Sequence, residues 1–175
     1  MPEKVQLFRL FVGAPSDVDE ALDVIRGQVE QWNRDHGPLT RARVEFTNWQ
    51  THSHPAAGAR PQALLNKQVV DRSDIVVGIF RFRFGTPTGV ADSGTEEEIL
   101  RSIRQGKTVM VYFAHQPVPK QGKDRREAAR IKKFKTKLGQ RALYHTYTDL
   151  QNFEDAFRQH LAGAMNELVA KHPLN

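Results

Sequence analysis

The sequence of 175 residues contains no cysteine, no apolar run long enough to cross a membrane, and no signal-peptide pattern within residues 1–20. Without cysteine, the chain has no disulfide framework and no thiol nucleophile, and a metal site would depend on histidine and carboxylate ligands. The absence of a membrane span and of a signal peptide gives the expectation of a cytoplasmic protein with no membrane partner. The chemistry of the chain therefore depends on its carboxylates, hydroxyls and basic side chains.

Several motifs of nucleotide-binding and hydrolytic enzymes are also missing. No P-loop and no GxGxxG fingerprint occurs, and no GxSxG nucleophile elbow is present. His52 and His54 form an HxH pair without a nearby third ligand, so we expect no metal site there. These absences argue against a serine or cysteine hydrolase and against the common nucleotide-binding folds with a Gly-rich fingerprint.

The positive charge of the chain is concentrated in one segment. The net charge is +6, but residues 120–137 hold nine Lys and Arg against two acidic residues, and the remainder is close to neutral. A solvated helix face is the more ordinary interpretation of such a segment. An acidic partner or a nucleic acid bound through residues 120–137 is the alternative.

Strand and helix patterns alternate along the whole chain. Apolar, β-favouring runs occur at residues 5–12, 43–49, 74–80, 107–113 and 141–147. Helical spacing of apolar residues occurs at residues 18–36, 62–72, 96–105, 124–138 and 150–170. This alternation predicts an α/β fold in which helices cover both faces of a five-stranded parallel sheet. The flavodoxin-like strand order 2-1-3-4-5 is expected, and residues 1–175 are expected to form one domain.

Local patterns add further expectations. Residues 16–19 resemble a capping box at the start of the first helix, and Thr95 with Glu98 resembles a second one. Trp49 is expected at the end of the second strand, where it either packs or stacks on a base. In the helix over residues 62–72, the side chains expected to face inward are Leu64, Leu65, Gln68 and Val69.

The strand order predicts where a ligand would bind. Its switch point lies between the first and third strands, so the loop of residues 13–17 should lie beside the loop of residues 81–95. Arg81 and Arg83 alternate and should point to opposite sides, while Gly85 and its neighbouring glycines expose backbone N–H groups. Arg60, in the loop before the second helix, either binds a phosphate or covers the surface.

Glu98 has two interpretations at this point. It either closes the helix cap or faces the crevice and contacts a sugar. A carboxylate beside a sugar can stabilise the oxocarbenium-like transition state of C–N glycosidic cleavage. Nicotinamide leaves NAD as a neutral molecule, so a single carboxylate can suffice for that substrate.

Seven runs of the sequence resemble a bacterial family of uncharacterised TIR-like domains, DUF4062. They are residues 11–18 (FVGAPSDV), 60–62 (RPQ), 66–68 (NKQ), 74–80 (DIVVGIF), 83–89 (RFGTPTG), 93–99 (SGTEEEI) and 106–113 (GKTVMVYF). That family looks like a relative of TIR domains and of nucleoside 2-deoxyribosyltransferases. Residues 94–98 match the Gly-Thr-x-x-Glu pattern of the transferases, with Glu98 in the last place, whereas TIR enzymes have a Trp-Cys-x-x-Glu version. The arginine that often follows the Ser-Asp-Val of the family is absent here.

The resemblance implies a TIR-like enzyme that cleaves the N-glycosidic bond of NAD or a related nucleotide in antiphage defence or stress signalling. Glu98 would be the catalytic carboxylate, NAD would be a substrate rather than a cofactor, and self-association would complete the site. The implied substrate-binding residues are Gly13, Ser16, Trp49, Arg60, Arg83, Gly85, Ser93 and Thr95. Two alternatives remain: a nucleoside deoxyribosyltransferase-like enzyme, and a non-catalytic module for protein interaction or nucleotide sensing.

Overall fold

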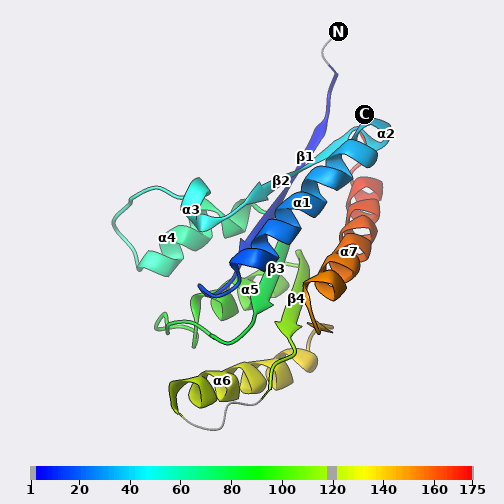
Figure 1. Cartoon of the computed structure of the whole chain (residues 1–175). Helices are drawn as coiled ribbons and strands as arrows, with labels where there is room; N and C mark the ends of the chain where they lie inside the picture. The colour runs from blue at the N-terminus through cyan, green and yellow to red at the C-terminus, as the bar shows by residue number, and fades with distance from the viewer. Residues whose placement is uncertain (1–2, 118–121, 175) are drawn as a thin grey trace.

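The computed structural model describes residues 3–117 and 122–174. Its strands are β1 (Gln6–Gly13), β2 (Ala42–Thr47), β3 (Ile75–Phe80), β4 (Thr108–Ala114) and β5 (His145–Tyr147). They lie in the order β2-β1-β3-β4-β5, and every pairing is parallel. The predicted α/β fold and its flavodoxin-like strand order are confirmed (Figure 1).

Helices lie on both faces of this sheet. They are α1 (Asp19–Asp35), α2 (Gly37–Thr40), α3 (Trp49–His52), α4 (Pro61–Gln68), α5 (Gly94–Arg104), α6 (Gly122–Gly139) and α7 (Leu150–Lys171). The 3-10 turn η1 (Val70–Arg72) follows α4. No helix in the described part of the chain is long and apolar enough to cross a membrane.

The alternation of side chains along β3 builds a separate core on each face of the sheet. Val77 and Ile79 pack with α1 and α7 on one face, whereas Val76 and Phe80 face α5, α6 and η1 on the other. Every residue of β3 is buried, which explains why this strand is a continuous apolar run in the sequence. The sheet is thus a rigid base, and its carboxyl edge carries the polar loops.

Several local expectations are corrected by the structure. No side chain caps α1, so the capping box predicted at residues 16–19 is wrong. Asp17 Oδ2 instead accepts hydrogen bonds from the backbone N–H groups of Phe82 (2.9 Å) and Arg83 (3.2 Å). This carboxylate therefore joins the loop after β1 to the loop after β3.

The second strand and the helix of residues 62–72 also differ from the prediction. β2 ends at Thr47, and Trp49 begins the short helix α3, which Asn48 caps through its side chain. The predicted helix is divided into α4 and η1, and the fully buried residue of α4 is polar Asn66. β5 has only three residues, because the chain still turns at the end of α6 through Arg141 and Ala142, whose N–H groups donate to Leu138 O.

Candidate functional site

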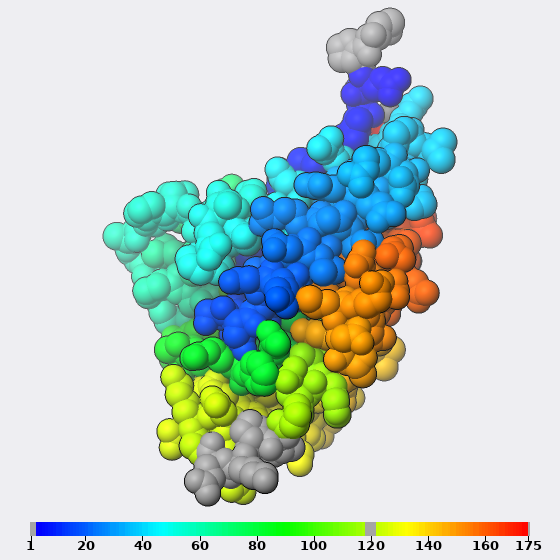
Figure 2. Space-filling view, in the orientation of Figure 1, coloured from blue at the N-terminus to red at the C-terminus, as the bar shows by residue number. Residues whose placement is uncertain are grey.

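A cleft opens at the carboxyl ends of β1 and β3. Gly13 pairs with Gly78, so the loops that follow these two strands reach the same edge of the sheet. The cleft has a volume of about 720 Å³, which is typical of small-molecule sites. Its walls are the loops after β1 and β3, part of α3, and the first turns of α4, α5 and α6. Figure 2 shows the blue start of α1, the cyan α3–α4 segment and the green loop after β3 meeting at one side of the molecule.

Glu98 lines this cleft although its side chain is almost fully buried, with 6% exposure. Its Oε1 accepts a hydrogen bond from Gln62 Nε2 at 3.0 Å, and its Oε2 lies against Gly13, where a Cβ would come within 2.1 Å. Burial raises the pKa of Glu98 to about 8 against the opposing hydrogen bond from Gln62, and the charge of Glu97 adds to the rise. The carboxyl is therefore mostly protonated at neutral pH.

The cap of α5 is made by residues other than Glu98. Ser93 Oγ accepts from the Glu96 N–H at 3.1 Å, and Glu96 Oε2 accepts from the Asp92 N–H at 2.8 Å. The helix begins one residue after Ser93 rather than after Thr95, so the capping interpretation of Thr95 and Glu98 is wrong. The consequence is that the Glu98 side chain is available to the cleft.

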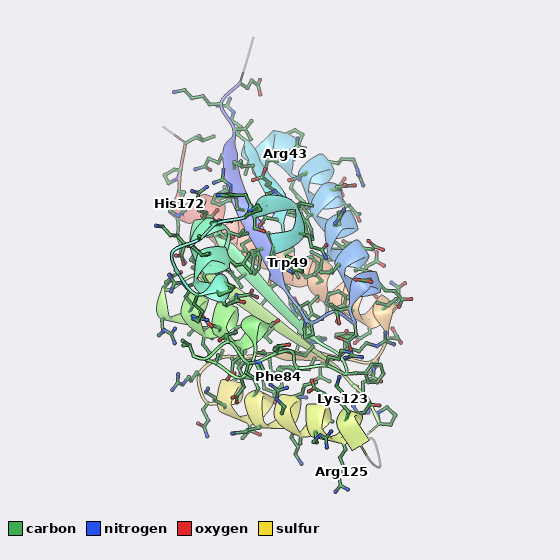
Figure 3. All side chains as sticks on the ribbon, turned by 90° about the vertical axis from the view of Figure 1, so that its left-hand side faces the viewer. Arg43, Trp49, Phe84, Lys123, Arg125 and His172 are labelled. Carbon is green, nitrogen blue, oxygen red and sulfur yellow. The ribbon has the colours of Figure 1, made fainter. Side chains whose placement is uncertain are left out.

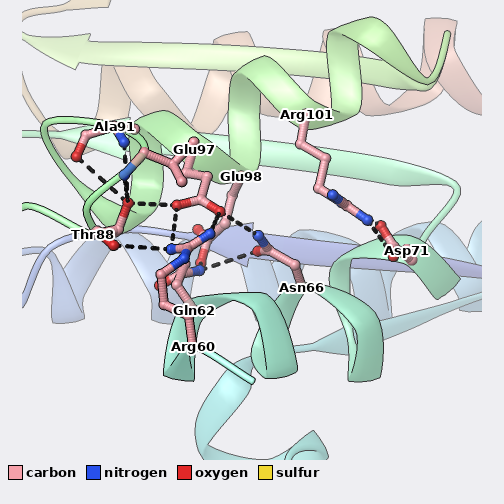
Figure 4. A network of polar contacts seen from close by, with 10 residues as sticks. Arg60, Gln62, Asn66, Asp71, Thr88, Ala91, Glu97, Glu98 and Arg101 are labelled. Carbon is pink, nitrogen blue, oxygen red and sulfur yellow. Dashed lines mark hydrogen bonds and ion pairs between the residues drawn. The ribbon is translucent and has the colours of Figure 1, made fainter. Parts of the chain in front are cut away.

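Glu97, the neighbour of Glu98, is in the opposite protonation state. Arg60 donates to both of its carboxylate oxygens at 2.6 and 2.9 Å, and Asn66 Nδ2 (2.9 Å) and Thr88 Oγ1 (2.5 Å) complete the set (Figure 4). The hydrogen bond from Arg60 lowers the pKa of Glu97, against the effect of burial. Adjacent glutamates that are held neutral and ionised are typical of sites with divided acid–base roles.

The structure brings most of the predicted site residues together. Those that line the cleft with Glu98 are Ser16, Trp49, Arg60, Arg83, Gly85 and Thr95. Gly13 lies behind the Glu98 carboxyl and Ser93 is fully buried in the α5 cap, so neither contributes to the cleft wall. Arg81 lines a different hollow beside Tyr147 and Asp149, which agrees with the expected alternation of Arg81 and Arg83.

Some residues of the site were not predicted. Gln62 and Asn66 lie one turn apart on α4 and together reach both glutamates. Their spacing of four residues was the available signal, because such residues share a helix face. Lys123 and Glu127 of α6 also line the cleft. Figure 3 shows Trp49 and Lys123 on either side of the loop that carries Phe84.

The helix α6 is docked through many of its charged residues. Arg130 donates to Gly85 O at 2.9 Å, to Glu127 Oε1 at 2.9 Å and to Asp92 O. Lys135 donates to Thr146 Oγ1 at 2.9 Å and Lys137 to Glu96 Oε1 at 3.0 Å. Several basic side chains of the segment 120–137 therefore help to hold α6 against the rest of the fold. Residues 120 and 121 lie outside the described residues. Binding of a nucleic acid or an acidic partner by this segment stays a prediction.

No group of three or more His, Asp or Glu in a metal-binding arrangement is found within residues 3–117 and 122–174. His52 Nδ1 lies 2.6 Å from Thr51 Oγ1, and Gln68 contacts His54 through the His54 backbone N–H and C=O. Both histidines thus have partners in the α3–α4 region.

Comparison with known proteins places residues 18–162 within the sequence profile of a family described as a domain of unknown function, DUF4062. No curated protein matches the chain. Among solved structures, an azoreductase from Bacillus anthracis str. Sterne is 13% identical with a TM-score of 0.47, covering 93% of this chain and 100% of its own. Oxidised flavodoxin 1 from Bacillus cereus is 11% identical with a TM-score of 0.43, covering 92% of this chain and 97% of its own.

Proposed function

The chain belongs to the DUF4062 family, and we propose that it is a TIR-like enzyme that cleaves the N-glycosidic bond of NAD or a related nucleotide. The observation that carries the proposal is Glu98, a single buried carboxyl that lines a cleft of about 720 Å³ at the carboxyl ends of β1 and β3. Buried carboxyls with a strongly raised pKa, located in a cleft, are typical of functional sites. A non-catalytic module would be expected to fold Glu98 onto its helix cap, whereas the cap of α5 is made by Ser93 and Glu96.

The proposed reaction requires the carboxyl to stabilise positive charge on the ribose. As the C1′–N bond breaks, its electron pair passes to the cationic ring nitrogen, nicotinamide leaves neutral, and positive charge develops on the ribose. Ionised Glu98 would stabilise that charge. Water then adds at C1′ and one proton is released, which gives nicotinamide and ADP-ribose. Since the leaving group needs no proton, this substrate requires no general acid besides Glu98.

The remaining cleft residues suit the parts of a nucleotide. Trp49 is 48% exposed at the rim and offers an aromatic face to a base. Ser16 and Thr95 line the same cleft as Glu98, and hydroxyl side chains suit a ribose. Within the described part of the chain, the Arg83 and Lys123 side chains have no hydrogen bond or ion pair, in contrast to Arg60, so both remain available to phosphate.

A second candidate function follows from the protonated state of Glu98. In a deoxyribosyltransferase-like reaction the departing base is neutral, so it needs a proton as it leaves. A carboxyl with a pKa of about 8 can donate one at neutral pH. Asp92, in the loop before α5, does not line the cleft.

The test is nicotinamide release from NAD by concentrated protein, with a crowding agent that favours self-association. We expect release by the wild type and a loss of about 100-fold or more in Glu98→Ala. Glu167→Ala, which changes an exposed glutamate of α7, should retain full activity. If no nicotinamide is released under these conditions, the NAD proposal is wrong, and release of free base from nucleosides becomes the next measurement.

A further inference from the structure

A chain of hydrogen bonds connects the cleft wall to Glu98. It begins at Arg60, whose guanidinium donates only, and whose two bonds to Glu97 require an ionised acceptor. Glu97 can therefore only accept from Asn66, which must present its Nδ2 to Glu97 Oε1. The direction of this bond is fixed by chemistry and leaves no choice for the orientation of the Asn66 amide.

The orientation of Asn66 fixes the next amide in turn. With Nδ2 directed at Glu97, Asn66 presents Oδ1 to Gln62, and Oδ1 can only accept. Gln62 must then present Nε2, which lies 3.1 Å from Asn66 Oδ1 and 3.0 Å from Glu98 Oε1. Gln62 is therefore an obligate donor to Glu98, and Glu98 Oε1 is an obligate acceptor.

From this polarity we infer that Gln62 is a positioning residue that holds Glu98 Oε1 and confines the proton of the neutral carboxyl to Oε2, the oxygen that Gln62 does not contact. Oε2 has no hydrogen-bond partner within residues 3–117 and 122–174. When Glu98 ionises, the same Gln62 bond stabilises the carboxylate, so Gln62 limits how far burial raises the pKa. The inference rests on the proposed function for the role of Glu98, but the proton position does not depend on it.

The backbone leaves space for this arrangement at two glycines. A Cβ on Gly94 would lie 2.8 Å from Gln62 Oε1, and a Cβ on Gly13 would lie 2.1 Å from Glu98 Oε2. Any side chain at these positions would displace one end of the Gln62–Glu98 pair. The pair is therefore enclosed from both sides, by the start of α5 at Gly94 and by the end of β1 at Gly13.

Charged groups from each neighbouring element bear on the titration of Glu98. Glu97 on α5 raises its pKa, and Arg60, which precedes α4, offsets the Glu97 charge. Arg83 after β3 and the pair Lys123 and Glu127 on α6 line the same cleft. A variant that tests Gln62 must leave all of these charges in place.

The experiment is a carboxyl titration by NMR of the whole chain labelled with 13C at glutamate Cδ, with Glu98 assigned by loss of its signal in Glu98→Gln. Gln62→Met keeps the side-chain volume but removes the donor. We expect the Glu98 titration to move upward by about one pH unit, since hydrogen bonds to charged groups are of that strength. Gln68→Met is the matched control on the same helix, because the Gln68 side chain hydrogen-bonds to His54 and not to Glu98 among residues 3–117 and 122–174, and it should leave the titration unchanged.

Asn66→Ala provides a second variant, one step further along the chain. It removes the group that orients Gln62, so we expect a smaller upward shift in the same direction. The inference is overturned if Glu98 has the same titration in Gln62→Met as in Gln68→Met. If Gln62→Met does not fold, the same comparison is made with Asn66→Ala. Because the titration needs no substrate, absence of NAD cleavage would not affect this result, and NAD cleavage with unmoved titration would reject only the role of Gln62.

Discussion

Glu97 and Glu98 show how neighbouring residues of one type acquire different chemistry. Glu97 receives four hydrogen bonds, two of them from Arg60, and its pKa is lowered. Glu98 receives one, from a neutral amide, and burial raises its pKa to about 8. The different hydrogen-bond partners of these two neighbouring carboxyls therefore give them different pKa values, and of the two only Glu98 lines the cleft.

At the scale of this residue, the direction of the pH dependence distinguishes the two candidate reactions. If ionised Glu98 stabilises an oxocarbenium ion, kcat/KM for NAD should rise with pH and level off above a pKa of about 8, since about a tenth of the carboxyls are ionised at pH 7. Between pH 7 and pH 8 the expected rise is roughly fivefold. Initial rates of nicotinamide release in buffers of constant ionic strength would measure it.

A fall in kcat/KM over the same interval would point to the protonated form of Glu98 as the active one. That outcome would favour a substrate whose leaving base needs a proton, as in the transferase-like alternative. A profile that does not change near pH 8 would mean that Glu98 does not act in the rate-limiting chemistry of either reaction.

At the scale of elements, the site depends on how closely β1 approaches α5. Gly13 ends β1 directly behind Glu98, so Gly13→Ala would place a methyl group within 2.1 Å of Oε2. We expect this variant to fold but to displace the carboxyl, with a loss of about 100-fold in NAD cleavage. Activity assays together with circular dichroism would measure both properties.

Gly27→Ala is the matched control for that variant. Gly27 lies within α1, and nothing lies within 4 Å of its Cβ position. Alanine there should leave activity unchanged and stabilise the protein by about 0.5–1 kcal/mol, the usual helix preference for alanine over glycine. Full activity in Gly13→Ala would show that Glu98 does not need its present position.

The sequence predicted the strands and their order more accurately than it predicted helix starts and buried helix faces. Apolar, β-favouring runs located all five strands, although β5 is shorter than its predicted run, and the predicted strand order correctly placed the loops after β1 and β3 together. The start of α5 was misplaced because Thr95 with Glu98 and Ser93 with Glu96 satisfy the same local pattern, and only tertiary contacts select between them. The inward face of α4 was also misjudged, since Asn66 is buried to meet Glu97 rather than to join an apolar core.

At the scale of the whole molecule, a buried carboxyl reduces stability in return for a reactive group. The unfolded chain ionises Glu98 near its ordinary pKa of 4.5, whereas the folded chain retains the proton up to about pH 8. When folding raises the pKa of a group, that group's contribution to the free energy of unfolding is largest at pH values below its pKa in the unfolded chain. The contribution is lost as the pH rises through its pKa in the folded protein. Folding should thus weaken between pH 4.5 and pH 8 by up to about 5 kcal/mol from this residue alone.

Glu98→Gln removes that dependence, because glutamine cannot ionise and still accepts from Gln62. Urea unfolding at a series of pH values should find the two proteins similar near pH 4.5, and Glu98→Gln increasingly more stable toward pH 8. Glu167→Gln on the exposed face of α7 should remain parallel to the wild type throughout. A constant difference between wild type and Glu98→Gln would mean that Glu98 is ionised in the folded protein, and the neutral carboxyl on which the second candidate reaction depends would be absent.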